Sequence, residues 1–148
     1  KAYTDTTMSL EIPKLGVSMP IVGVPQSDAG WDVTWLGNSA GYLAGSAFPT
    51  WAGNTVITGH VWDAYNQPGA FAEIKSLKYG DQVQIQAWGV TYTYEVRDSK
   101  LMTVKNVNAA FQSEQYDWVT LVTCEFYNPF SGDYLFRRAV RAVLVSVK

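Results

Sequence analysis

The sequence predicts a mainly β domain whose strands form a closed barrel or a sandwich. Strand-like apolar stretches recur along the 148 residues, short turn-forming segments separate them, and helical spacing is confined to one stretch. Closing a sheet removes its exposed edges, so many short strands with little helix favour a barrel or a sandwich over an open sheet.

The expected strands follow one another along the whole chain. They cover residues 9–12, 19–24, 55–58, 82–88, 91–97, 119–123 and 134–147. Residues 83–86 and 92–96 alternate with period two on either side of Gly89, which predicts an antiparallel hairpin with one buried face. The best helix candidate is 68–77, because Phe71, Ile74 and Leu77 keep helical spacing after a proline near its start.

Composition limits the possible partners. The length and the 47% hydrophobic content fit a single domain, 1–148, with one sizeable core. Charged residues make up 16% and the net charge is −2, so the chain lacks the basic surface that nucleic acid or anionic lipid would need. Six Trp and nine Tyr suit either a packed β core or a groove for peptide or sugar.

The chain contains one cysteine and one histidine, and each ends a strand-like run. Cys124 follows 119–123 and His60 follows 55–58 and a glycine. A single cysteine excludes an internal disulfide and a site with several thiolates, which leaves a buried inert thiol or a reactive one. Strand ends that open into loops are where scaffolds expose reactive groups.

The sequence around both residues resembles the sortase family. The run 120–124, Thr-Leu-Val-Thr-Cys, resembles the TLxTC signature of sortases, and Thr58-Gly59-His60 resembles their strand-terminal Gly-His. Residues 134–141 resemble the final sortase strand, which supplies an essential arginine. In this sequence Arg137, which follows the cysteine, is the residue that matches it. Supporting segments at 10–17 and 77–81 extend the match over nearly the whole chain.

This resemblance implies both a fold and an activity. The fold is a closed eight-stranded β-barrel with a few short helices. The activity is that of a cysteine transpeptidase, which cleaves an LPxTG-like sorting motif between Thr and Gly and passes the acyl chain to an amine. The implied partners are surface proteins that carry the motif, with a peptidoglycan cross-bridge or a pilin lysine as the acceptor. The implied location is the bacterial cell surface, outside the cytoplasm, with membrane attachment through a segment absent from this chain.

The chemistry of acyl transfer explains the three residue types. Cys124 would form the thioester and His60 would protonate the leaving amine. The guanidinium of Arg137 is always charged and would stabilise the oxyanion, with the backbone N–H of Glu125 as a second donor. By resemblance, Thr123 contacts substrate or supports the oxyanion site, although a β-branched residue also simply suits a strand.

Two further arginines compete with Arg137 for the oxyanion role. Period-two alternation predicts Arg137 and Arg141 on one face of the last strand and Arg138 on the other. The motif and the spacing from Cys124 favour Arg137, whereas Arg138 and Arg141 are expected to be solvated or structural.

No metal or cofactor is expected. No Asp or Glu lies between Asp32 and Asp63, where calcium-stimulated sortases carry acidic ligands before their histidine. Two rival functions stay open on the sequence: a cysteine peptidase with water as acceptor, and a non-catalytic β-barrel binding module.

Overall fold

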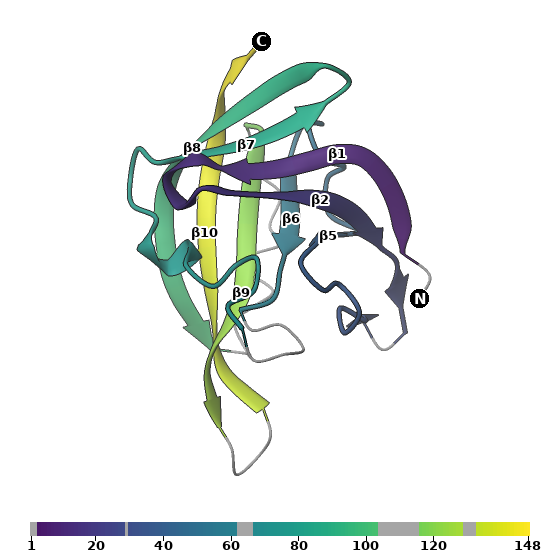
Figure 1. Cartoon of the computed structure of the whole chain (residues 1–148), viewed down its shortest axis with the longest axis vertical. Helices are drawn as coiled ribbons and strands as arrows, with labels where there is room; N and C mark the ends of the chain where they lie inside the picture. Colours follow the sequence, from purple (N-terminus) through teal and green to yellow (C-terminus); the bar gives the residue numbers. More distant parts are fainter. Residues whose placement is uncertain (1–2, 29, 62–66, 104–115, 129–132) are drawn as a thin grey trace.

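Eight strands close into one barrel in the computed structural model of the chain, in the order β1-β2-β5-β6-β9-β10-β8-β7 (Figure 1). The structure describes residues 3–28, 30–61, 67–103, 116–128 and 133–148, with residues 124–128 and 133–136 described by their backbone only. The barrel strands are β1 (Thr4–Ile12), β2 (Val17–Val24), β5 (Ala40–Leu43), β6 (Asn54–Thr58), β7 (Gln82–Ala87), β8 (Val90–Thr103), β9 (Trp118–Asn128) and β10 (Asp133–Val147). A separate two-stranded sheet consists of β3 (Gln26–Ser27) and β4 (Gly30–Trp31).

The predicted fold class is confirmed, and each predicted strand lies within or closely overlaps a barrel strand. The hairpin around Gly89 is β7–β8, with Ala87 paired to Val90. The remaining barrel strand, β5, was not predicted. It pairs in parallel with β2 and antiparallel with β6, so it joins these two strands in the barrel wall.

The helix predicted at 68–77 is wrong. This segment forms a series of turns and one short 3-10 helix, η2 (Ile74–Ser76), and the other described 3-10 turn is η1 (Pro13–Leu15). The amides of Ala72, Ile74 and Leu77 each donate to the carbonyl three residues earlier, as in 3-10 turns, and not to the carbonyl four residues earlier as in an α-helix. Phe71, Ile74 and Leu77 are nevertheless buried, since a spacing of three residues also suits a 3-10 arrangement.

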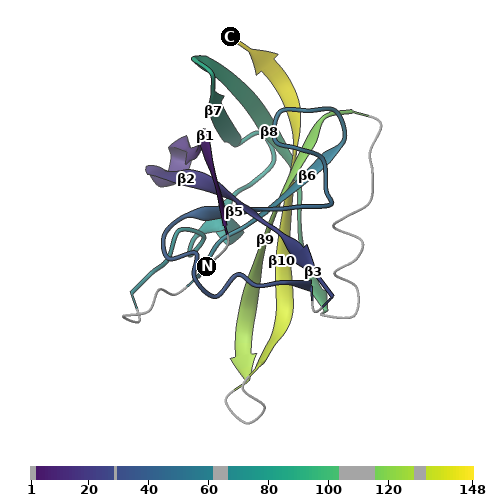
Figure 2. The ribbon, with the colours of Figure 1, turned by 90° about the vertical axis from the view of Figure 1, so that its right-hand side faces the viewer.

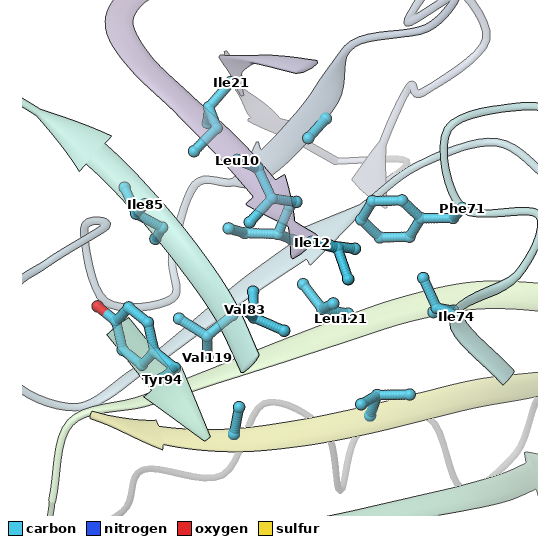
Figure 3. Close-up of a cluster of buried hydrophobic side chains, with 14 of the residues drawn as sticks. Leu10, Ile12, Ile21, Phe71, Ile74, Val83, Ile85, Tyr94, Val119 and Leu121 are labelled. Carbon is cyan, nitrogen blue, oxygen red and sulfur yellow. The ribbon is translucent and has the colours of Figure 1, made fainter. Parts of the chain in front are cut away.

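Consecutive residues of the central strands belong to two different apolar clusters. Ile57 on β6 and Leu121 on β9 join the main cluster, which fills the barrel and also contains Leu10, Ile85 and Tyr94 (Figure 3). Their neighbours, Val56 and Val122, join a second cluster. Because successive strand side chains point to opposite faces, the second cluster lies on the outer face of the barrel. Its other buried members are Val24, Leu36 and Leu43.

Strands β6, β9 and β10 lie side by side in the barrel wall (Figure 1). β6 is parallel to β9, and β9 is antiparallel to β10, which it follows over most of its length (Figure 2). The sequence-predicted site residues lie on or directly after these three strands. In the described part of the chain, no helix is long and apolar enough to span a membrane.

Candidate active site

The strand register brings His60, Cys124 and Arg137 to one level of the barrel. Thr58, the last residue of β6, pairs with Val122 on β9, and His60 and Cys124 each lie two residues further on. On the other side of β9, Cys124 is the direct partner of Arg137 on β10. Residues far apart in the sequence therefore meet in one row across three neighbouring strands.

Hydrogen bonds from two threonines hold β6 and β9 together beside this row. Thr58 Oγ1 donates to Val122 O at 2.7 Å, and one residue further on Thr123 Oγ1 donates to Gly59 O at 3.3 Å. Thr123 is buried, at 3% exposure, so its hydroxyl is committed to the backbone just before His60. This contact gives Thr123 a structural role in aligning the two strand ends.

Two glycines let the chain pass close to His60. A Cβ on Gly59 would lie 2.6 Å from the ring of Phe71, which is fully buried beneath the motif. A Cβ on Gly69 would lie 2.3 Å from His60 O. The amide of Gly69 donates to Val61 O at 2.7 Å, so the segment after residue 67 returns against the end of β6 and supports the backbone of His60.

The imidazole of His60 is half-buried and contacts a backbone carbonyl on another segment. Its Nε2 lies 2.8 Å from Val33 O. Val33 packs against the second cluster, and Leu36 is a buried member of it. His60 is therefore on the outer side of the barrel, beside the segment that covers the second cluster.

Arg137 lies on the same outer side. Val140 and Ala142 of β10 belong to the main cluster inside the barrel, so alternation directs Arg137 outward. Among the described residues, its Nη1 is buried and has no hydrogen-bond partner. A buried guanidinium N–H without an acceptor is a costly feature, and it suits a group that serves a ligand.

The other two arginines have different surroundings. Arg141 shares the outward direction of Arg137, and its Nη2 is also buried without a hydrogen bond among the described residues, but its guanidinium stacks on the ring of Trp118 with 4.3 Å to the ring centroid. Arg138 pairs with Thr123 across the strands, and its Nη1 donates to Ser99 Oγ at 3.4 Å. Glu125 follows Cys124 on β9 and pairs with Phe136, which puts its backbone N–H one residue from the row.

Sequence reasoning missed Val33 and Gly69. Val33 acts through its carbonyl group, which every residue has, so no side-chain signal marks it. Gly69 follows a proline, a pattern that predicts the start of a helix. Within the described ranges, no group of three or more His, Cys, Asp or Glu side chains is arranged to hold a metal ion.

Comparison with known proteins gives consistent matches. A family model described as a sortase domain matches residues 10–145. The chain is 27% identical over 122 residues to sortase D of Bacillus subtilis, a match that covers 82% of this chain and 54% of the relative. The chain thus spans about half the length of that curated relative.

Solved structures support the same assignment. A lid mutant of sortase A from Corynebacterium diphtheriae superimposes with a TM-score of 0.77 and 29% identity, over 94% of this chain and 69% of that chain. Sortase C-1 from Actinomyces oris gives a TM-score of 0.75 and 27% identity, over 94% of this chain and 73% of that one. Because the family model covers nearly the whole sequence and the barrel is shared, the chain belongs to the sortase family.

Proposed function

We propose that this domain, residues 1–148, is a cysteine transpeptidase in which Cys124 is the nucleophile, His60 its proton partner and Arg137 the oxyanion stabiliser. The substrate is a surface protein that bears an LPxTG-like sorting motif, cleaved between Thr and Gly. The acceptor is an amine, from a peptidoglycan cross-bridge or a pilin lysine. The enzyme works on the outside of the bacterial cell, at its surface.

The first half-reaction forms a thioester. The sulfur of Cys124, as thiolate, attacks the carbonyl carbon of the motif Thr, and negative charge develops on the carbonyl oxygen. The Arg137 guanidinium stabilises that charge, and the N–H of Glu125 is a second donor. The carbon–nitrogen bond to Gly then breaks, and the imidazolium of His60 gives its proton to the leaving amine.

The second half-reaction reverses these roles. The acceptor amine attacks the thioester carbonyl, the carbon–sulfur bond breaks, and the proton lost by the amine returns to His60. Cys124 leaves as thiolate, so the enzyme ends in the state in which it began. If both groups start neutral, the only addition is an initial transfer of the thiol proton to His60.

The observation that carries this proposal is the single row formed by His60, Cys124 and Arg137, together with the buried Arg137 Nη1 that has no partner among the described residues. Arg141 also has a buried guanidinium nitrogen that makes no hydrogen bond among the described residues, but its guanidinium stacks on Trp118, whereas Arg137 is the direct strand partner of Cys124. Thr123 supports the site through its bond to Gly59 O, which aligns the strands that carry His60 and Cys124.

The test is product analysis by mass spectrometry. A library of sorting-motif peptides is incubated with the domain, with and without an added amine, alongside the Cys124→Ala variant. We expect cleavage between Thr and Gly and a new amide with the added amine, and neither product with Cys124→Ala.

Other results would assign another function. Equal amounts of free acid with and without the amine would show a peptidase that uses water as acceptor. Binding of a peptide without cleavage, retained after alkylation of the thiol, would show a non-catalytic module.

A further inference from the structure

The contact of His60 with Val33 fixes which ring nitrogen carries a proton. The distance from His60 Nε2 to Val33 O is 2.8 Å, a good hydrogen-bond length. A carbonyl oxygen only accepts, so Nε2 must be the donor in both the neutral and the charged imidazole. Nδ1 is then the nitrogen that binds and releases a proton, because the hydrogen bond made by one ring nitrogen determines whether the other is protonated.

Val33 belongs to the 31–36 segment, which is fastened to the barrel at both ends. At its start, Trp31 Nε1 donates to Ala44 O at 2.9 Å. At its end, Leu36 is 4% exposed within the second cluster, and its amide lies 3.4 Å from the same Val33 O. The carbonyl that meets His60 is therefore on a segment with a fixed position, and not on a free loop.

Tyr3 adds a clamp from the beginning of the chain. Its hydroxyl donates to Asp32 O at 2.7 Å and accepts from the amide of Trp35 at 3.2 Å. These two bonds bracket Val33, one on each side. The ring of Tyr3 packs against the second cluster, so the hydroxyl is itself held in place.

We propose that the 31–36 segment, clamped by Tyr3, is the positioning element for the imidazole of His60. The Val33 carbonyl keeps Nε2 protonated and holds the ring in one orientation, so that Nδ1 exchanges the proton during acyl transfer. Tyr3 is a positioning residue that acts through this segment and touches no reacting atom. The inference rests on the proposed function for the role of His60, whereas the hydrogen bond itself does not.

Nuclear magnetic resonance tests the ring directly, because His60 is the only histidine in the sequence and its signals are unambiguous. In the wild-type domain labelled with nitrogen-15, we expect a proton on Nε2 that exchanges slowly with water and shows an Overhauser effect to Val33. In the neutral ring, Nδ1 is expected to be unprotonated. A neutral ring with its proton on Nδ1, or an Nε2 proton lost to fast exchange, would overturn the inference.

Tyr3→Phe tests the clamp, since it removes the hydroxyl and keeps the ring. We expect kcat on a sorting-motif peptide to fall about three- to tenfold, as for the loss of a hydrogen bond that orients a catalytic group, with KM little changed. The Nε2 proton is expected to exchange faster. The matched control is Tyr79→Phe, since Tyr79 is 73% exposed and the substitution keeps the ring over which the Arg97 guanidinium lies.

A Tyr3→Phe variant with wild-type kcat and an unchanged Nε2 proton would refute the role of Tyr3. The resonance experiment needs no turnover, so it separates this inference from the proposed function. If Cys124→Ala kept full activity while the Nε2 proton behaved as described, the proposed function would fail and the hydrogen bond would stand.

Discussion

At the scale of single residues, Arg137 is charged and half-buried, and its Nη1 is buried without an acceptor within the described residues. An unsatisfied buried donor costs about 1–3 kcal/mol, and more when it is charged. Its direct strand partner is Cys124, so the unsatisfied donor lies on the residue that pairs with the proposed nucleophile. The oxyanion of a tetrahedral intermediate would supply the missing acceptor.

Replacing the three arginines of β10 tests this assignment. Arg137→Ala should lower kcat/KM on a sorting-motif peptide about 10² to 10³-fold, as for the loss of one preorganised oxyanion donor. Arg137→Lys should remain clearly impaired, because lysine keeps the charge but lacks the planar fork.

The neighbouring arginines are the controls for that series. Arg138→Ala should be much milder, since Arg138 pairs with Thr123 and bonds to Ser99. Arg141→Ala should cost roughly 0.5–2 kcal/mol of stability by losing its stacking on Trp118, with kcat/KM largely retained. Near-normal activity in Arg137→Ala together with a large loss in either neighbour would show that the oxyanion role is misassigned.

At the scale of elements, the Gly-His end of β6 depends on a close contact with the turn that follows it. The ring of Phe71 occupies the space in which a side chain at residue 59 would lie. This contact gives the glycine before His60 a packing reason, in addition to its place in the family motif.

Gly59→Ala should therefore destabilise the domain by about 1–3 kcal/mol, as is typical of overpacking a filled core. Chemical denaturation measures the effect. The control is Gly23→Ala on β2. There the atom nearest to a new Cβ is the Cβ of Thr4, at an ordinary contact distance of 3.4 Å. Equal stability of the two variants would show that residue 59 has more room than this contact implies.

The turn before β7 is stabilised by hydrogen bonds and an ion pair of Asp81. Asp81 Oδ2 accepts from the amide of Lys78 at 2.7 Å and from Lys14 Nζ at 2.9 Å. The bond from Lys78, followed by that from Lys14, holds the pKa of the Asp81 carboxyl below its usual value. A carboxyl whose pKa is lowered by folding stabilises the fold when it is ionised, and it loses that contribution as the pH falls.

Asp81→Asn should thus lower the free energy of unfolding by about 0.5–1.5 kcal/mol at neutral pH, given the partial exposure of the pair. The difference in the free energy of unfolding between wild type and variant should be largest above about pH 5. It should shrink below about pH 4, as the pH falls through the lowered pKa of Asp81 in the folded state. Denaturation at several pH values measures it, with the exposed Asp5→Asn as control. A difference that persists unchanged at pH 2 to 3 would contradict the electrostatic explanation.

At the scale of the whole molecule, the site lies on the outer face of the barrel. The main cluster fills the interior, while His60 and Arg137 lie on the side of the second cluster. The row depends on the parallel pairing of β6 with β9 and the antiparallel pairing of β9 with β10. Any variant that shifts either register by one residue would separate the three groups.

Much of this architecture could be predicted from the sequence, because apolar alternation and turn residues marked most of the barrel strands. β5 was missed because Ala-Gly-Tyr-Leu is short and contains a glycine, so its strand conformation depends on pairing with β2 and β6. The 68–77 helix was wrong because the spacing of Phe71, Ile74 and Leu77 fits successive 3-10 turns equally well. The Val33 contact could not be predicted, since a backbone carbonyl leaves no trace in the sequence.

If Cys124 carries the acyl chain as a thioester, the intact mass of the enzyme during turnover should show the adduct. The wild-type domain is mixed with a sorting-motif peptide without an added amine, quenched in acid and digested to locate the adduct. We predict an increment equal to the peptide up to its Thr, located on Cys124, removed by hydroxylamine and absent from Cys124→Ala. An adduct on another residue, or normal turnover by Cys124→Ala, would show that Cys124 is not the nucleophile.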